Sequence, residues 1–205
     1  MSALFPPSVP RYHEGGVSRS EVRAASRGLV GSVLVLAGAE VGAGRSVPEN
    51  LRRGPGAVAE LRVLPGLYWH RITEAAGEQF FVDTWTVANE ADRIGYRFKG
   101  GKPLAFVPRE QPFGAGSDPS NIVDACYPYG SIQVPGGTEP IVLHRDAVSG
   151  GGYMMMGTVI SADMDIIGQL QPNTAVNFVR VDMATALQAR HDRLAVIQRI
   201  QELLA

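Results

Sequence analysis

Residues 116–169 read GSDPSNIVDACYPYGSIQVPGGTEPIVLHRDAVSGGGYMMMGTVISADMDIIGQ, and this stretch decides most of the expected fold. A polar cluster of Ser120, Asn121 and Asp124 precedes an extended run that ends in a Pro-Gly-Gly turn. A second extended run carries Asp146 and is followed by a triple-glycine turn and a long apolar run. Because glycine allows close backbone approach and positive φ, this layout suits a site where backbone amides meet a small polar or anionic group.

Hydrophobic periodicity predicts further strands on both sides of this stretch. Alternation with a period of two indicates half-buried strands, whereas residues 67–79 are compatible with a short helix. Gly100 and Gly101 would supply the positive φ values of a tight hairpin between two of the strands. The expected strands span residues 28–36, 58–64, 80–87, 94–98, 103–107, 153–161 and 175–181.

Two helices are predicted near the end of the chain. Ser161 would cap the free amides of the first, and the carboxylates of Asp163 and Asp165 favour its positive end. The second spans residues 183–204, about six turns at the usual 3.6 periodicity. The residues expected to face the core are Ile166, Ile167 and Leu170 from the first helix and Met183, Leu187, Leu194, Ile197 and Leu204 from the second.

The order of these elements favours a mainly β fold with peripheral helices. Strands dominate the pattern, as in a barrel or a sandwich. Proline and glycine among residues 1–28 indicate an irregular arm, and residues 39–56 are the best candidate for a linker. The chain of 205 residues is long enough for one large domain or two small ones.

Composition argues against several classes of protein. With 19 basic and 20 acidic side chains the net charge is −1, so the composition shows no excess of positive charge for binding nucleic acid or an anionic membrane. The longest apolar run, residues 29–39, falls short of the ~20 residues of a spanning helix. The N-terminus lacks the pattern of a secretory signal, and Cys126 is the single cysteine, so a reducing cytoplasm is expected.

Five ordered motifs carry a resemblance to a known family. They are LRVLPGLYW (61–69), NEADRIGYRFKG (89–100), SNIVDACYPYGSIQV (120–134), EPIVLHRDAVSGGGY (139–153) and GTVISADMDIIGQLQPN (157–173). Together they resemble the carboxyltransferase domain of urea carboxylases and the allophanate hydrolase subunit 2 family, which includes 5-oxoprolinase subunits. The resemblance covers residues 58–182.

The resemblance implies two cyclophilin-like β-barrel halves in tandem, of which this chain corresponds to the second and the tail of the first. Residues 1–56 would then hold an N-terminal arm, partial strands of the first half and a linker. A cyclophilin-like β-barrel would follow over residues 57–182, with a long C-terminal helix over residues 183–205.

The same motifs mark candidate site residues. The carboxylate of Asp124 suits an amide substrate, because it can accept N–H groups or remove a proton, and Asp146 is the second catalytic candidate. The guanidinium of Arg97 would match a carboxylate or carbonate. The residues assigned to substrate binding are Arg93, Tyr96, Arg97, Ser120, Asn121, Tyr127, Ser149, Gly150, Gly151, Gly152 and Tyr153.

Structural readings of these residues remain open. Ser120 is also a plausible N-cap, Asp146 and Ser149 are also typical of turns, and either arginine could pair with an acid at the edge of the core. Ser149 does not fit a nucleophile elbow, since Ala147 stands where a glycine is required. The histidines show no spacing or cysteine company typical of a metal site, so no metal is expected. Met154, Met155 and Met156 are expected to pack in the core.

By this resemblance the chain is expected to be a carboxyltransferase-type subunit that passes a carboxyl group from carboxybiotin to the nitrogen of a urea-like or amide substrate. The chain shows no biotin-attachment motif and no ATP-binding loop, so a biotin carrier or biotin carboxylase and a companion barrel subunit would act in trans. One alternative is an ATP-dependent 5-oxoprolinase or lactamase subunit. Another is a non-catalytic binding or regulatory module built on the same barrel.

Overall fold

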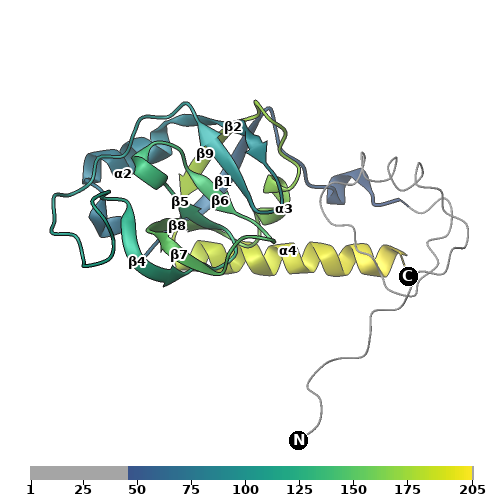
Figure 1. Ribbon diagram of the computed structural model, residues 1–205. Coiled ribbons are helices and arrows are strands. Elements are labelled where there is room, and N and C mark those ends of the chain that lie inside the picture. The colour runs from purple at the N-terminus through teal and green to yellow at the C-terminus, as the bar shows by residue number, and fades with distance from the viewer. Residues whose placement is uncertain (1–45, 205) are drawn as a thin grey trace, which may run out of the picture.

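Seven strands close into a barrel in the order β1-β8-β5-β6-β3-β2-β9. Figure 1 gives a ribbon view of this computed structural model. The structure describes residues 46–204. Neighbouring strands are antiparallel except β1 and β9, which are parallel. The barrel strands are β1 (Val58–Pro65), β2 (Thr84–Ala91), β3 (Gly95–Lys99), β5 (Ser131–Gln133), β6 (Ile141–Leu143), β8 (Met155–Val159) and β9 (Ala175–Arg180).

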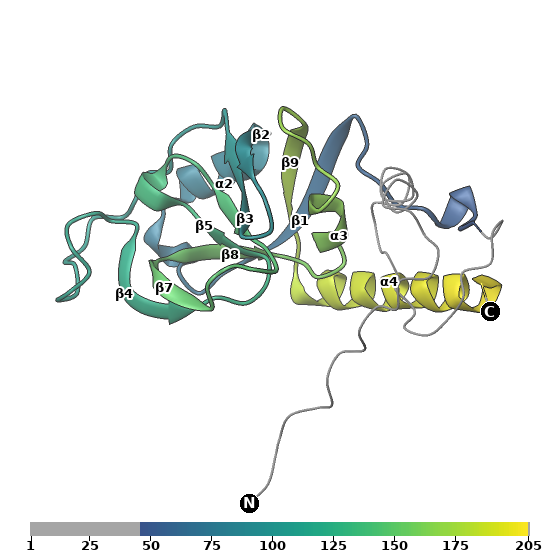
Figure 2. The same ribbon diagram turned by 45° about the vertical axis from the view of Figure 1, so that its right-hand side comes forward.

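Two further strands and the helices lie around the barrel. The strands β4 (Asn121–Cys126) and β7 (Gly150–Tyr153) form a separate two-stranded sheet, called here the β4–β7 ribbon. The long helix α4 runs along one side of the barrel and extends beyond it (Figures 1 and 2). The helices are α2 (Glu74–Val82), α3 (Met164–Ile167) and α4 (Met183–Leu204), with 3₁₀ turns η1 (Glu49–Leu51), η2 (Trp69–Arg71) and η3 (Pro135–Gly137).

The barrel interior is filled by alternate side chains from its strands. On β1, Ala59, Leu61 and Val63 are buried and the residues between them are more exposed, as a strand with a period of two requires. Aromatic rings from different elements meet inside: Phe80 of α2 stacks on Phe178 of β9 with ring centroids 4.8 Å apart. The prediction of a mainly β barrel with a long C-terminal helix is therefore confirmed.

Several predicted elements are confirmed at nearly the expected bounds. The strand over residues 58–64 is β1, the strand over residues 175–181 is β9, and the terminal helix begins and ends at the expected residues. The three methionines 154–156 are all buried, as are the core residues expected around α3. The strand expected over residues 28–36 lies outside the described residues.

The boundary between the helix at 67–79 and the strand at 80–87 was predicted wrongly. The chain makes the short turn η2 and then α2, whose helix continues through Phe80 to Val82. Thr73 caps this helix, its hydroxyl accepting a bond from the amide of Ala76 at 3.3 Å. Phe80 reaches the core from the helix, so its apolar character was not evidence for a strand.

The hairpin expected between residues 94–98 and 103–107 is also wrong. β3 pairs with β2 and β6 instead, and residues 103–107 leave the barrel, where Phe106 bridges to Ile72. Of the two glycines expected in the turn, Gly100 has positive φ, at 99°, and Gly101 does not. A Cβ on Gly101 would lie 2.5 Å from the ring of Trp85, so this glycine lets the chain cross the end of a buried tryptophan.

Residues 150–161 differ from the single strand and glycine turn that were expected. Residues 150–152 are part of strand β7 and none of them has positive φ, and a separate strand, β8, starts at Met155. The break falls at Met154, whose amide donates to the carbonyl of Ser120 at 2.8 Å. This bond turns the chain from the ribbon into the barrel.

The packing face of α4 differs from the apolar stripe that was predicted. Met183, Leu187 and Leu194 are exposed, by 59%, 48% and 55%. The helix packs instead through Ala186 and Ala189, which form a small cluster with Ile160 and Ala162. The small alanine side chains form this contact because they allow the helix to approach the barrel closely.

Asp163 is a buried carboxylate that ties several elements together, not the helix-favouring charge that was expected, and Ser161 makes no cap. The side chain of Asp163 is fully buried. Arg62 of β1 donates to it from the backbone N at 2.9 Å, from Nε at 2.9 Å and from a terminal guanidinium nitrogen at 2.7 Å. Arg53 adds a bond of 2.5 Å. Nearby, Asp165 of α3 lies 2.5 Å from Arg193 of α4, which extends the network to the terminal helix.

The acid response of the fold follows from Asp163. Burial by itself would raise the pKa of this carboxyl, but the hydrogen bonds from Arg62 and Arg53 outweigh it and hold the pKa below its ordinary value. A group whose folded pKa is depressed stabilises the fold fully above its unfolded pKa of about 3.9, and that contribution is lost as pH falls through the folded pKa.

Replacing Asp163 by Asn should lower the free energy of unfolding at pH 7 by roughly 3 kcal/mol, since it leaves two arginines without their buried counter-charge. The variant should also lose less stability than the wild type as pH falls below about 4. Urea unfolding followed by circular dichroism measures both. Asp146→Asn, in an exposed ion pair, is the control and should scarcely change the midpoint. Equal stability of Asp163→Asn and wild type at pH 7 would contradict this role.

Tyr127 fixes β7 to the end of β4. Its hydroxyl accepts a bond from the amide of Tyr153 at 2.9 Å and donates to the carbonyl of the same residue at 2.7 Å. The ring itself is buried beside Leu143 and Met155. One phenol therefore satisfies both backbone groups of the residue at which β7 ends.

Tyr127→Phe should loosen that end of the ribbon without unfolding the barrel. The amide of Tyr153 should exchange with solvent about fivefold faster, the effect of losing one hydrogen bond worth about 1 kcal/mol. Hydrogen exchange measured residue by residue reads this out. The control Tyr129→Phe removes the hydroxyl that contacts His144 and should leave the exchange rate of the Tyr153 amide unchanged. Unaltered exchange at Tyr153 in the Tyr127 variant would show that the phenol does not hold the ribbon.

Candidate functional site

The β4–β7 ribbon brings together most of the site residues expected from the sequence. Asn121 pairs with Tyr153, Ala125 with Gly151 and Cys126 with Gly150, with a shift in register between the first and second pairs. In both ribbon views the two strands lie side by side at one side of the barrel (Figures 1 and 2).

The three glycines of β7 let it lie close against β4. A Cβ on Gly151 would be 3.2 Å from the ring of Tyr127, and one on Gly150 would be 3.2 Å from the carbonyl oxygen of Ala125. Both distances are tighter than ordinary contact. A side chain at Gly150 or Gly151 would therefore crowd its neighbour, and the strand without side chains leaves peptide groups bare beside Asp124.

Asp124 is the exposed carboxylate of this ribbon. It lies on β4, and within residues 46–204 no cation pairs with it. Its Oδ1 would stand 3.6 Å from a Cβ at Gly150, so the missing side chain opens the space next to it. A solvent-facing, unpaired carboxylate with room beside it can accept N–H groups or take a proton.

Tyr127 and Tyr153, the two tyrosines at the ribbon, have different roles. Burial raises the pKa of the Tyr127 phenol, partly offset by its bond to the backbone of Tyr153, so the hydroxyl stays protonated at neutral pH. Both of its hydrogen-bonding functions are used within the ribbon. The ring of Tyr153 is 42% exposed and is free to contact a ligand. Tyr127 is thus a positioning residue that holds β7, whereas the exposed ring of Tyr153 is available for contact with a ligand.

Ser120 and Asn121 contribute through internal bonds. The Ser120 side chain is buried: its hydroxyl donates to Asp118 Oδ1 at 2.6 Å and accepts from the amide of Gly136 at 3.0 Å. It therefore caps no helix and ties the start of β4 to η3. The backbone carbonyl of Asn121 accepts bonds from Arg71 and Arg109.

Asp146, the other catalytic candidate, is held by Arg93 outside the ribbon. The two side chains form a two-point pair, with Nε to Oδ2 at 2.6 Å and a terminal nitrogen to Oδ1 at 2.9 Å. The hydrogen bond from Arg93 holds the pKa of Asp146 below its ordinary value. A carboxylate with both oxygens occupied and a lowered pKa is poorly suited to take a proton from a substrate. In the same loop, the Ser149 carbonyl accepts the Tyr127 amide at 2.8 Å.

Arg93, Tyr96 and Arg97 make their contacts at β3 and its neighbours. Arg97 pairs with Glu139 at 3.1 Å, so its guanidinium is engaged with an acid of the protein. The ring of Tyr96 lies 5.7 Å from that of His144. Within the described residues none of these three side chains hydrogen-bonds with β4 or β7. The structure therefore divides the expected site residues into a ribbon group and a β3 group.

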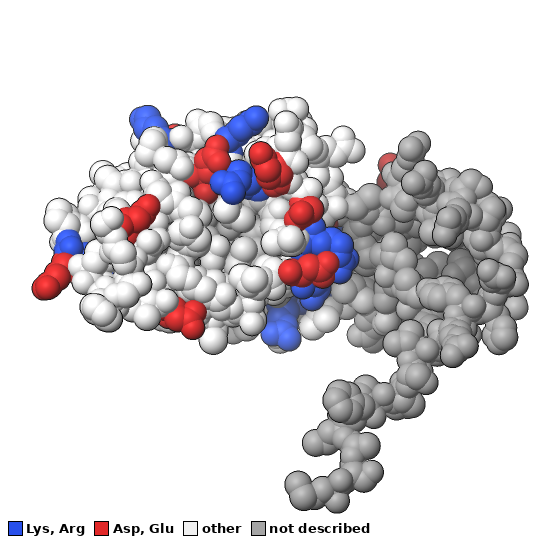
Figure 3. Space-filling view, viewed as in Figure 1, with Lys and Arg blue, Asp and Glu red and all other residues white. Residues whose placement is uncertain are grey.

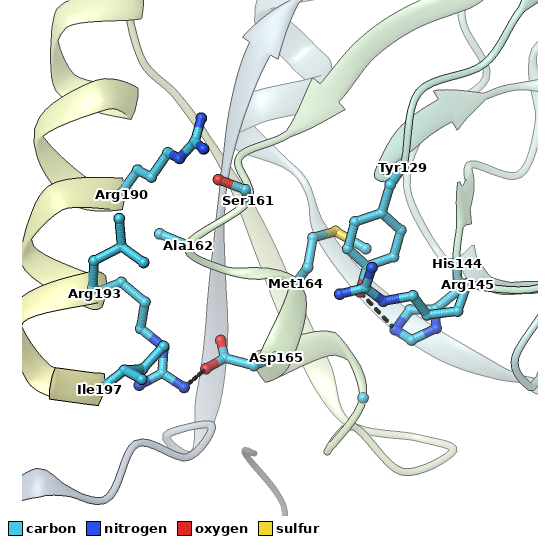
Figure 4. A pocket seen from close by; sticks show the side chains of 12 residues that line it. Tyr129, His144, Arg145, Ser161, Ala162, Met164, Asp165, Arg190, Arg193 and Ile197 are labelled. Carbon is cyan, nitrogen blue, oxygen red and sulfur yellow. Dashed lines mark hydrogen bonds and ion pairs between the residues drawn. The ribbon is translucent and has the colours of Figure 1, made fainter. Parts of the chain in front are cut away.

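Two features were missed by sequence reasoning. One is the pair Arg71 and Arg109, which meet at the ribbon although 38 positions separate them, since neither belongs to a motif that signals an anion site. The other is a cavity of about 500 Å³ between the barrel and α4 (Figure 4), a size typical of ligand pockets. In Figure 4 Tyr129, His144 and Arg145 line it from the barrel, and Arg190, Arg193 and Ile197 from α4.

The cavity at α4 has a mixed character. Burial, helped by the charges of Arg145 and Arg93, lowers the pKa of His144, so its ring is neutral at neutral pH. Arg145 lies over the ring of Tyr129, 4.1 Å from its centroid. Among its lining residues, Asp165 of α3 forms an ion pair with Arg193 of α4 (Figure 4). None of the site residues expected from the sequence lines it.

The rest of the surface gives no stronger signal. On the face in Figure 3 acidic and basic side chains are interspersed, and much of the face is uncharged. In the part of the chain that the structure describes, no three His, Cys, Asp or Glu side chains gather as a metal site. Among residues 46–204, no helix has the length and apolar character needed to cross a membrane.

Comparisons with known proteins agree with this architecture. Residues 19–180 match the family described as carboxyltransferase domain, subdomain A and B. The chain is 32% identical to a 5-oxoprolinase subunit of Escherichia coli (strain K12) over 68% of its own length and 42% of that protein. It is 30% identical to the urea amidolyase of Lachancea kluyveri, over 61% of this chain and 7% of that one.

A solved structure shows the same fold. The crystal structure of the Kluyveromyces lactis urea carboxylase superposes with a TM-score of 0.63 at 29% identity, covering 69% of this chain and 12% of that one. The chain thus spans less than half the length of each of these relatives. The family match covers well over half of the sequence, and the chain belongs to the carboxyltransferase-domain family, subdomains A and B.

Proposed function

We propose that this chain is a carboxyltransferase-type subunit of a multi-subunit carboxylase or amidolyase. It receives a carboxyl group from carboxybiotin and passes it to the nitrogen of a urea-like or amide substrate. The observation that carries the proposal is Asp124, an exposed and unpaired carboxylate beside a strand of three glycines. Residues 57–182 would form the carboxyltransferase-like unit, and α4 would be its terminal helix.

The ribbon fits a carboxylated ureido ring. Gly150, Gly151 and Gly152 leave peptide groups uncovered by side chains. The ring of Tyr153, which is 42% exposed, adds apolar surface at the end of β7. Flat, partly apolar rings bind such surfaces, with a few polar groups fixing their orientation. When bound, carboxybiotin would supply an activated carboxyl group.

The chain's own residues would orient the acceptor and take its proton. Asp124 would accept an N–H of the urea-like or amide group and remove its proton as the new nitrogen–carboxyl bond forms and the bond between the carboxyl group and the biotin nitrogen breaks. The proton would then pass to the biotin nitrogen that is released. Tyr127 holds β7 in position against β4. Arg93 and Asp146 fix the loop that leads into β7, and this loop also presents Ser149. A companion barrel subunit and a biotin carrier act in trans.

A second candidate is an ATP-dependent 5-oxoprolinase subunit, which needs no biotin. The match to a 5-oxoprolinase subunit over 68% of the chain favours it. The same ribbon would then bind a cyclic amide, with Asp124 in contact with its N–H. Purifying the tagged chain from its native cell separates the two, by mass spectrometry of what accompanies it and a streptavidin blot. A biotinylated carboxylase supports carboxyl transfer, whereas a companion barrel subunit without biotin supports the amide-hydrolysing reading.

Asp124→Asn should lower turnover of the native complex at least 100-fold, the usual contribution of a general base, while the complex still assembles. Turnover is measured as acceptor-dependent ATP hydrolysis. Glu90→Gln, an equivalent change at an exposed carboxylate of β2, is the control and should keep full activity. Unchanged turnover of Asp124→Asn with normal assembly would remove Asp124 from the mechanism. Unchanged turnover with weakened assembly would favour a non-catalytic module.

A further inference from the structure

Two guanidinium groups converge on one backbone carbonyl at the start of β4. A terminal nitrogen of Arg71 donates to the carbonyl oxygen of Asn121 at 3.2 Å. A terminal nitrogen of Arg109 donates to the same oxygen at 3.3 Å. Arg71 belongs to η2, and Arg109 to the loop between β3 and β4, so the fold brings together two cations from separate segments.

The backbone around both arginines is fixed. Ile72 forms a β-bridge with Phe106, and the amide of Val107 donates to the carbonyl of Arg71 at 2.8 Å. These bonds bind the turn that carries Arg71 to the loop that carries Arg109. Backbone contacts therefore hold Arg71 and Arg109 near each other.

The side chains are held as well. Arg71 lies over the ring of Tyr68, 4.6 Å from its centroid. Arg109 donates to Gln111 Oε1 at 2.6 Å, and the amide nitrogen of Gln111 donates to the carbonyl of Asp118 at 2.6 Å. Both arginines are partly buried. A ligand would meet donors already placed in position, which lowers the ordering cost of binding.

The charge of this pair is not balanced by the protein. Within residues 46–204 no carboxylate forms an ion pair with Arg71 or Arg109, unlike Arg53, Arg62, Arg93 and Arg97. Burial and the neighbouring charge of Arg109 both lower the pKa of Arg71, although a guanidinium keeps its proton at any ordinary pH. Two positive charges that donate to the same neutral carbonyl oxygen and have no carboxylate partner among the described residues favour a bound anion.

We propose that Arg71 and Arg109 form a binding site for a planar oxyanion, a carboxylate or carbonate. A guanidinium presents its N–H groups as a flat fork that matches these groups with two parallel bonds. The anion clamp expected at Arg97 would thus lie at this pair, because Arg97 is already engaged with Glu139.

The site borders the ribbon, since Asn121 is the first residue of the strand that carries Asp124. Two sources of such an anion suit this position: the carboxyl group in transfer, or a carboxylate on the acceptor. Assigning the anion to a reactant rests on the proposed function. Binding of the anion itself does not.

The test is an NMR titration of the full-length labelled chain alone, following the Arg Nε–H resonances. Sodium bicarbonate, sodium acetate and sodium phosphate are compared with sodium chloride at equal ionic strength. Saturable shifts at Arg71 and Arg109 with bicarbonate or acetate support the site. Tighter bicarbonate binding identifies the group in transfer, and tighter acetate binding identifies an acceptor carboxylate. Shifts no different from those with chloride, or tightest binding of phosphate, would overturn the proposal.

Variants link the shifts to the two residues. Arg71→Gln and Arg109→Gln should each weaken binding at least tenfold, a change of about 1.4 kcal/mol. Arg71→Lys and Arg109→Lys keep the charge but not the fork, and should weaken binding less. Arg199→Gln, an exposed arginine on α4, should bind as wild type. Wild-type affinity in both Gln variants, with folded spectra, would refute the assignment. Because the titration uses no partner and no turnover, it can fail while carboxyl transfer is upheld, and the reverse.

Discussion

The buried carboxylate of Asp163 is the constraint on which much of this fold depends. A single charge in the interior is tolerated only when it is fully hydrogen-bonded, and here Arg62 and Arg53 supply four donors. Arg62 is on β1, the strand that closes the barrel by pairing in parallel with β9. Asp165, two residues on, continues the network to Arg193 of α4. The barrel's closing strand, the short helix α3 and the terminal helix are therefore positioned by one set of charges.

The ribbon depends on a different constraint, which is close packing of backbone on backbone. The glycines of β7 and the phenol of Tyr127 allow β7 to pair closely with β4, the strand on which Asp124 is exposed. The protein thus has a rigid barrel with a ribbon and loops that carry its exposed polar groups. Active sites are often arranged in this way, because a rigid scaffold can position groups that face solvent. The family match and this geometry are consistent with each other.

Elements with a regular hydrophobic pattern over many residues were predicted correctly from the sequence, whereas features set by tertiary contacts were not. β1 and α4 were predicted at nearly their observed bounds because their local patterns agree with their environment. Phe80 was misread because a core residue at a helix end looks like one in a strand. Gly101 was assigned to a hairpin, although it is required by the neighbouring ring of Trp85. Such contacts join residues far apart in the chain, and no local pattern records them.

The candidate site shows the same division. The motifs pointed to Ser120, Asp124 and the glycines, and the structure places all of them on or beside the ribbon. They left open whether Arg93 and Arg97 bind an anion or pair with acids of the protein, and the structure shows ion pairs with Asp146 and Glu139. They could not show that Arg71 and Arg109 meet, since 38 positions separate these two residues.

The role of the ribbon in carboxyl transfer is tested most directly by a single-turnover experiment on the native complex. The complex is charged with radiolabelled bicarbonate and ATP, and the label is followed from the biotinylated protein to the small-molecule nitrogen. The label should reach the acceptor only when this chain is present, and should remain on the biotinylated protein when the chain is removed. Transfer at the same rate without the chain would contradict the account.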